Sequence, residues 1–380
     1  MIVPDPRPVK ALLDPSHEAF AAEADAFAER VIAPRRPPED DAASRAEARA
    51  ILEELGSGKM LDPIGRGDWR ACCLAREALA ARSPLADAVF ALQGLGTLPL
   101  LFTKAPAGAR FAEGAIAGRA MAAFAMTEPE AGSDVAAIQT RARKDGGDYV
   151  LNGAKSYISN AGIADFYVVF ASTDPEARGK GISAFLVPAG AKGCRFTGPQ
   201  VLSAPHPLGT IALEECRVPA TNRLGGEGRG FALGLQTLDR MRATVGAAAC
   251  GMAARALDEA ARHARERRQF GKPLAEFQLV QEKIARMTVD LHAARLLVYR
   301  AAWEADHGAE RVTMEAAMAK SFATEAAQRI VDDAIQILGA RGVLADHPVD
   351  RLYRAVRALR IYEGTTEIQH LVIAGQVLQG

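Results

Sequence analysis

The spacing of hydrophobic and polar residues divides the chain into three blocks. Across residues 11–124, apolar side chains recur at helical intervals, as at Phe20, Phe27 and Val31, and Pro34 interrupts the pattern. The first block is therefore predicted to be helical.

The second block, residues 125–226, has the composition of β-strands. Its apolar segments are short, rich in β-branched and aromatic residues, and separated by Gly, Pro, Asn or Asp. They cover residues 148–152, 165–170, 182–187 and 210–213. Since no helical crossover separates these segments, an antiparallel sheet is predicted and a parallel Rossmann sheet is not.

After Gly225-Gly226 the helical pattern returns over residues 230–266, 276–306, 313–338 and 366–378. These segments are apolar on several sides, which is typical of helices inside a bundle or against another subunit. The chain is thus predicted to be an α+β multi-domain protein. It would have an N-terminal helical domain (1–124), a middle antiparallel β-domain (125–226) and a C-terminal four-helix-bundle domain (227–380).

Composition excludes several function classes. The 46 basic and 46 acidic residues cancel, which leaves no electrostatic footprint for nucleic acid or anionic membrane. The uncharged apolar run at residues 88–103 is too short to span a bilayer and predicts a buried helix and turn. The five cysteines lack metal-binding spacing, so we expect reduced thiols, with neither disulfide bonds nor a bound structural metal. The N-terminus shows no signal-peptide pattern, which predicts a cytoplasmic protein.

A carboxylate near the C-terminus is the first candidate for catalysis. Glu363 precedes Gly364 and a predicted helix in which Thr366 and Gln369 fit a capping box. A carboxylate held rigidly at such a junction can be aimed at a substrate as a general base. Taken alone, the segment is more typical of a plain surface turn than of a catalytic site.

A second candidate is the loop Ala125–Asp134, which joins the first block to the β block. It combines hydroxyls, backbone amides and Gly132, a set that can donate hydrogen bonds to a polar ring edge or a phosphate-bearing ligand. A simple connection between domains is the alternative.

Taken together, the motifs resemble those of the acyl-CoA dehydrogenase family, flavoenzymes that oxidise acyl-CoA thioesters to enoyl-CoA. The segment 151–161 is similar to the family's flavin motif, with Tyr157 where Trp is common and Ser159 where Thr is common. The resemblance covers about residues 125–370 and rests on the segments 125–134, 151–161, 266–278, 336–339 and 362–365.

The resemblance implies an FAD site that spans two subunits of a homotetramer. In the family, the loop after the first block meets the pyrimidine end of the flavin, and residues of the 151–161 motif lie along its ring. Other motifs reach the FAD that a neighbouring subunit binds. The residues implied are Met126, Thr127, Tyr157, Ser159, Arg267, Phe270, Gln336, Gly339 and Thr365.

The resemblance also implies a reaction, in which Glu363 removes the α-proton of the acyl-CoA while flavin N5 accepts the β-hydride. The backbone N–H of Glu363 and a flavin hydroxyl would hold the thioester oxygen. Some relatives carry the base at the position of Met241, which cannot accept a proton. The substrate-binding residues implied are Ser133, Asp239, Arg242 and Gly364, and the implied electron acceptor is an electron-transfer flavoprotein.

Three departures leave questions open. Ala340 replaces a family glycine, which would weaken FAD binding if the position needs a positive φ, and Ala355 replaces a usual aspartate. His206, between two prolines, either touches the substrate or belongs to a rigid surface turn. An oxidase or monooxygenase of the same fold, or a non-catalytic scaffold, remains as an alternative function.

Overall fold

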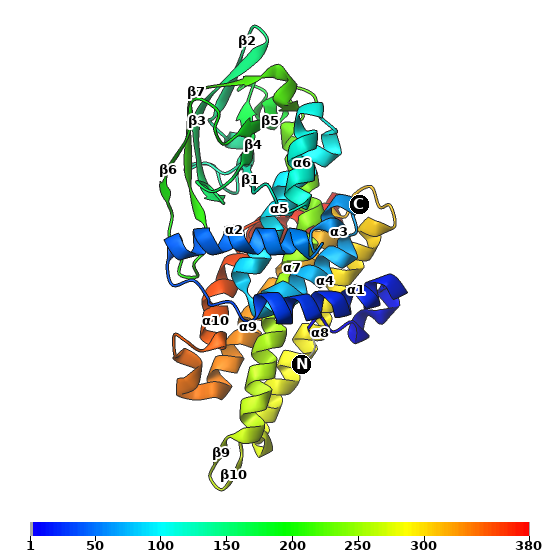
Figure 1. Cartoon of the computed structure of the whole chain (residues 1–380). Coiled ribbons are helices and arrows are strands. Elements are labelled where there is room, and N and C mark those ends of the chain that lie inside the picture. Colours follow the sequence, from blue (N-terminus) through cyan, green and yellow to red (C-terminus); the bar gives the residue numbers. More distant parts are fainter. Residues whose placement is uncertain (1–2, 380) are drawn as a thin grey trace. The chain divides into compact units, whose positions relative to one another are not determined.

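The computed structural model describes residues 3–379, which form two compact units. The first unit combines the chain up to Arg35 with Gly67–Asp87 and everything from Asp239 onward, and the second combines Arg36–Arg66 with Ala88–Leu238. Figure 1 shows the helices and strands of both units, with labels on many of them. The N-terminal helical block thus contributes helices to both units, and helices α5 and α7 each pass from one unit into the other.

The first unit is helical. Its long helices match the sequence pattern closely, because α7, α8, α9 and α11 begin and end within two residues of the predicted segments. Helix α10 was not predicted. The elements are η1 (Arg7–Leu12), α1 (Pro15–Phe27), η2 (Ala28–Ile32), α4 (Trp69–Arg82), α7 (Gly230–Glu266), β9 (Arg268–Gln269), β10 (Lys272–Pro273), η7 (Leu274–Glu276), α8 (Gln278–Asp306), α9 (Thr313–Leu338), η8 (Gly339–Val343), α10 (Pro348–Leu359) and α11 (Thr366–Gln379).

The second unit contains the sheet and shorter helices. Its helical elements are α2 (Asp41–Ser57), α3 (Asp62–Arg66), α5 (Pro84–Thr103, mostly in this unit), η3 (Pro106–Gly108), α6 (Ala109–Ile116), η4 (Val135–Ala137), η5 (Arg178–Gly181) and η6 (Ala220–Asn222). Its strands are β1 (Ala122–Ala125), β2 (Arg141–Asp145), β3 (Asp148–Ser159), β4 (Phe166–Ser172), β5 (Ile182–Pro188), β6 (Cys194–Pro199), β7 (Leu208–Pro219) and β8 (Arg223–Leu224).

The sheet is mixed: the segments predicted as strands pair antiparallel, β3 with β7 and β4 with β5, while some other pairs are parallel. Its strand order is β6-β7-β3-β2-β4-β5-β8, with β1 also paired to β4. Most neighbours are antiparallel, but β1 runs parallel to β4, and β2 meets β4 in parallel at Arg141 and Ser172. Strand β1 lies before the segments that the pattern identified, and its four small or half-buried residues give too short a signal to recognise.

Strand β4 lies in the middle of the core and explains why its sequence reads as a continuous apolar run. Tyr167 and Val169 belong to one buried cluster and Phe166, Val168 and Phe170 to another. Because successive strand residues point to opposite faces, a strand covered on both faces needs apolar residues throughout.

Helix α5 was predicted as a helix followed by a turn and is instead one helix that continues through Pro99. Among the described residues it is the one helix long and apolar enough to cross a membrane, and most of its apolar stretch is buried. Leu100, for example, belongs to the same core cluster as Phe166 and Phe170. These contacts are those of a core helix.

Candidate active site

The turn that joins α10 to α11 carries the candidate base in an unusual backbone conformation. Glu363 has φ 54° and Gly364 has φ 93°, so two successive residues are left-handed. A residue with a Cβ pays about 1–2 kcal/mol for this conformation, so its surroundings must hold it there. At Gly364 a Cβ would lie 2.4 Å from Nε2 of Gln369, so any larger residue would have to displace that amide as well as adopt a positive φ.

Three side chains from three helices hold the turn by its carbonyl oxygens. Arg242 Nε on α7 donates to the Glu363 carbonyl oxygen at 3.2 Å, and Lys320 Nζ on α9 donates to the Gly364 carbonyl oxygen at 2.7 Å. Gln369 Nε2 on α11 reaches both oxygens, at 3.3 and 3.0 Å. The two carbonyls are therefore fixed, while no hydrogen bond within the described part of the chain engages the Glu363 backbone N–H.

Arg242 is itself held in place. Its Nη1 donates to Asp239 Oδ1 at 2.7 Å, and Thr313 Oγ1 donates to Asp239 Oδ2 at 2.6 Å. Both residues predicted to bind substrate on this helix thus lie beside the turn. The side chain of Arg242 is nearly fully buried and acts on the turn rather than extending into solvent.

The Glu363 carboxyl group has one oxygen, Oε2, that is buried and has no hydrogen-bond partner among the described residues, and the pKa of the group is raised. Burial raises the pKa of this carboxyl, and the nearby charges of Arg76, Arg242 and Lys320 oppose that rise without cancelling it. A carboxylate that is destabilised by burial but kept near three cations can be ionised before reaction and neutral after it.

Arg76 belongs to a buried ion pair whose charge acts on Glu363, the candidate base. Its Nε and Nη2 donate to the two carboxylate oxygens of Asp87 at 2.7 and 2.9 Å, and its Nη1 donates to Thr244 Oγ1 at 2.9 Å. Asp87 neutralises most of the charge of Arg76. Arg76 therefore lowers the pKa of Glu363 only in part, and that pKa stays above the usual value of a glutamate.

In the second unit, a buried ion pair holds the loop that carries Met126 and Thr127. Lys155 Nζ on β3 donates to the Met126 carbonyl oxygen at 3.0 Å and to Glu128 Oε1 at 2.8 Å. Burial lowers the pKa of Lys155 to about 8, whereas the pKa of Glu128 falls below its usual value because Lys155 and backbone N–H groups stabilise the carboxylate against burial. The Ser156 N–H also donates to the Thr127 carbonyl oxygen at 3.0 Å, so loop and strand form one rigid element.

Two further candidates lie at the end of β3. The pairing register of β3 with β7 shifts between Lys155 and Ile158, and Tyr157 adopts φ 55° with a ring that is 61% exposed. Ser159 Oγ is 2.8 Å from His206 Nε2, and burial together with the charge of Arg45 lowers the pKa of His206 to about 4. The imidazole is therefore neutral near pH 7. Sequence reasoning considered His206 only as a substrate contact or a turn residue and missed this contact.

The remaining cofactor candidates lie at one end of the bundle in the first unit. Arg267 and Phe270 follow α7 on the β9–β10 hairpin, where Phe270 has φ 50° and is 94% exposed. Gln336 and Gly339 are exposed at the end of α9. Burial lowers the pKa of His263, and the charges of Arg341 and Arg267 lower it further, which indicates that positive charge gathers here.

Comparisons with known proteins identify the relatives of this arrangement. Family models for the acyl-CoA dehydrogenase middle domain and C-terminal domain match residues 123–216 and 228–378. The probable acyl-CoA dehydrogenase fadE25 of Mycobacterium bovis is 37% identical over 377 residues, which cover 97% of this chain and 96% of that protein. This chain belongs to the acyl-CoA dehydrogenase family.

Solved structures of acyl-CoA dehydrogenases share the fold over nearly the whole chain. Butyryl-CoA dehydrogenase from Megasphaera elsdenii has a TM-score of 0.89 and 33% identity, with 96% of this chain and 99% of that chain covered. Glutaryl-CoA dehydrogenase from Mycobacterium smegmatis, solved in complex with FADH2, has a TM-score of 0.87 and 26% identity, with 98% and 96% covered. The chain is thus an acyl-CoA dehydrogenase, an oxidoreductase acting on CH–CH groups, of a family that uses FAD.

The residues of this acyl-CoA dehydrogenase fit the chemistry of FAD. Tyr157 presents an exposed ring that can cover an apolar heterocycle, and the positive end of the bundle around Arg267 suits a diphosphate. Among the described residues, no ion pair engages Arg267. Thr127 and Ser133 lie in the rigid loop and at its exposed end, where their hydroxyl groups are available to ligands.

Two departures from the family pattern have local explanations. Positive φ falls on Gly339, not on Ala340, so alanine is conformationally acceptable at position 340. Arg354, whose neighbour Ala355 replaces an aspartate, forms an ion pair with Asp350 one helical turn earlier.

The capping box predicted for α11 was wrong by one position. Thr365, not Thr366, is the residue before the helix, and its hydroxyl accepts from the Ile368 N–H at 3.3 Å. Thr366 Oγ1 instead donates to Glu325 at 2.8 Å. Gln369 does reach back, but to the carbonyl oxygens of Glu363 and Gly364.

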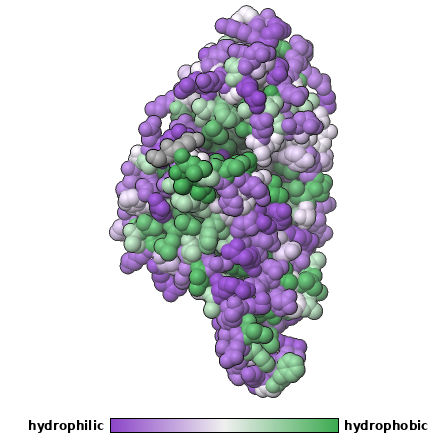
Figure 2. Space-filling model, turned by 180° about the vertical axis from the view of Figure 1, so that it is seen from behind, coloured by the Kyte–Doolittle hydropathy of each residue, from purple (hydrophilic) through white to green (hydrophobic). Residues whose placement is uncertain are grey.

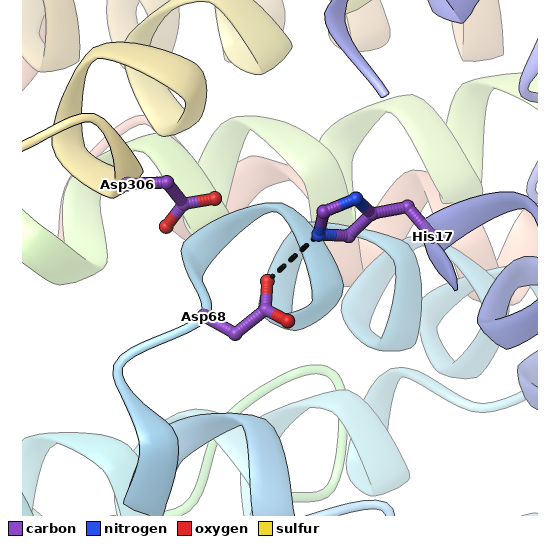
Figure 3. A group of neighbouring side chains, drawn as sticks. All are labelled: His17, Asp68 and Asp306. Atoms are coloured by element: carbon purple, nitrogen blue, oxygen red, sulfur yellow. Dashed lines mark hydrogen bonds and ion pairs between the residues drawn. The ribbon is translucent and has the colours of Figure 1, made fainter. Parts of the chain in front are cut away.

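Figure 3 shows a group of potential metal ligands, His17, Asp68 and Asp306. The two carboxylates already cap the N-terminus of helix α4: Asp68 accepts a hydrogen bond from the Ala71 N–H at 3.0 Å, and Asp306 accepts one from the Trp69 N–H at 2.8 Å. Asp306 also binds the guanidinium of Arg70 at 2.6 Å. A cap with a cation already present accounts for this cluster without a metal ion.

Proposed function

We propose that this enzyme dehydrogenates an acyl-CoA thioester between its α- and β-carbons, with Glu363 as the base. The observation that carries the proposal is the buried, unpartnered Oε2 of Glu363, on a turn that Arg242, Lys320 and Gln369 hold in a strained conformation. A strained turn that several side chains over-determine is typical of a functional site.

The acidity of the substrate sets what the site must supply. An α-proton beside a thioester is weakly acidic, so the base must be shielded from water and the carbonyl must be polarised. Burial supplies the first requirement, because it raises the pKa of the Glu363 carboxyl. The uncommitted Glu363 N–H would supply a donor for the thioester oxygen.

The other residues would hold cofactor and substrate. Bound FAD supplies an acceptor for the β-hydride. Thr127, with neighbouring Met126, would contact its pyrimidine end, Tyr157 and Ser159 its ring, and Ser133 the pantetheine of CoA. Asp239, Arg242 and Gly364 would flank the thioester, and Thr365 would lie beneath the cofactor.

A homotetramer would complete the cofactor site, with Arg267, Phe270, Gln336 and Gly339 contacting the FAD of a neighbouring subunit. Large apolar side chains stand exposed on helices of the first unit, among them Leu371 at 68%, Val377 at 67% and Leu378 at 85%. Figure 2 shows apolar side chains gathered at the surface of one face. Apolar surface of this kind favours association with another subunit.

An electron-transfer flavoprotein would accept the electrons in turn. The direct test of the proposed reaction is anaerobic mixing of the FAD-loaded enzyme with straight-chain, branched, cyclic and dicarboxylic acyl-CoA esters. We expect at least one ester to bleach the flavin and to yield a product lighter by two hydrogen atoms. A protein that takes up no FAD, or that no ester bleaches, would refute the proposal.

A further inference from the structure

Lys320 is a buried cation whose position would be expected to lower the stability of the fold. Its side chain is 0% exposed in the middle of α9, and its ammonium donates to the Gly364 carbonyl oxygen at 2.7 Å. Among the described residues, no carboxylate lies within ion-pair distance of it. A buried ammonium without a carboxylate partner costs free energy, so its place beside the catalytic turn calls for another role.

The turn needs such a donor. With Glu363 and Gly364 both left-handed, the two successive carbonyl groups point toward α7, α9 and α11, where their oxygens find donors. Arg242 serves the first carbonyl and Lys320 the second, with Gln369 shared between them. Loss of Lys320 would leave the Gly364 oxygen with the amide of Gln369 alone.

We propose that Lys320 is a positioning residue for the catalytic base, holding the Glu363–Gly364 turn through the Gly364 carbonyl oxygen and placing a positive charge behind the Glu363 carboxylate.

The charges around both groups agree with this role. Burial and the charge of Arg242 lower the pKa of Lys320 to about 8, and the carboxylate of Glu363 opposes this fall. Lys320 in turn lowers the pKa of Glu363. The ionisable groups that act on this pair are Arg76 on α4, Asp87 on α5, Arg242 on α7, Glu325 on α9, Tyr362 in the turn and Glu367 on α11.

The two effects can be separated by two substitutions. Lys320→Met removes the donor and the charge, whereas Lys320→Gln keeps a neutral donor. Lys283→Met is the matched control, because Lys283 lies on α8 and pairs with Asp333 at 2.5 Å. The inference rests on the proposed function, so the test uses two readouts that need no turnover.

The first readout is amide hydrogen exchange of the segment 361–366 in the FAD-loaded enzymes. The second is the infrared titration of the Glu363 carboxyl band, assigned by difference from Glu363→Gln. For Lys320→Met we expect faster exchange and a Glu363 pKa about one unit higher, the shift typical of losing one nearby opposite charge. For Lys320→Gln we expect nearly wild-type exchange with the same pKa shift.

Wild-type exchange and titration in Lys320→Met, or equal changes in Lys283→Met, would overturn the role of Lys320. If Lys320→Met does not fold, the titration of Lys320→Gln alone decides. Failure of every acyl-CoA to bleach the wild-type flavin would instead refute the proposed reaction, and both readouts would still report on Lys320.

Discussion

The substitution Gly364→Ala tests whether the proposed role of the Glu363–Gly364 turn depends on its backbone conformation. A Cβ at this position meets Gln369 Nε2 at 2.4 Å, and φ is 93°. The left-handed conformation costs alanine about 1–2 kcal/mol. Displacing the Gln369 amide removes two hydrogen bonds of about 1 kcal/mol each.

These free-energy costs sum to about 3 kcal/mol. If the whole cost falls on the turn, the population of its native conformation drops roughly 100-fold. We therefore expect flavin bleaching by the preferred acyl-CoA to slow about 10- to 100-fold in Gly364→Ala while FAD stays bound. Stopped-flow absorbance under anaerobic conditions measures the rate, and gel filtration confirms the assembly.

Gly375→Ala is the matched control, because it lies in α11 and a Cβ there meets no atom within 4 Å. Alanine stabilises a helix interior by about 0.5–1 kcal/mol relative to glycine, so its bleaching rate should equal that of the wild type. Equal rates in Gly364→Ala and Gly375→Ala would refute the idea that this turn must be left-handed.

Three further predictions concern separate parts of the molecule. Lys155→Met should leave Glu128 buried without its cation and destabilise the loop of Met126 and Thr127 by about 3–5 kcal/mol, seen as FAD loss and a lower melting temperature, whereas an unchanged FAD content would contradict this. Phe270→Asp should weaken assembly, so that light scattering reports a mass below four times the 40.3 kDa chain; a tetramer of unchanged stability would argue against a role for the hairpin. The bleaching rate should rise with pH through the raised pKa of Glu363, because only the ionised carboxylate accepts a proton, and a rate that falls over that range would be evidence for a different base.

The long helices were predictable because their apolar periodicity persists over many turns. Helix α9, for example, begins and ends at the predicted residues 313 and 338. Helix α10 (Pro348–Leu359) was not predicted, although its apolar residues Val349, Leu352 and Val356 recur at helical spacing. Strand β1 was missed because four residues carry no usable period, and with it the parallel pairing to β4.

The sequence predicted the main residues of the candidate site but not the residues that hold them in place. Glu363, Gly364, Asp239 and Arg242 were recognised from motifs, and they lie together in the first unit. Lys320 was not recognised, because a single lysine in an alanine-rich helix gives no sign that it ends at a carbonyl 44 residues further along the chain. The contact of His206 with Ser159 is equally invisible, since it depends on a turn 47 residues away.

The central claim is that the Glu363 carboxylate removes the substrate proton, and Glu363→Gln tests it most directly. Glutamine keeps the size and the backbone N–H but cannot accept the proton, whereas Glu367→Gln alters an exposed carboxylate four residues away. The measurement is anaerobic bleaching of the bound flavin by an acyl-CoA that reduces the wild type. We predict that Glu363→Gln retains FAD and does not bleach while Glu367→Gln bleaches normally, and normal bleaching in Glu363→Gln would contradict the claim.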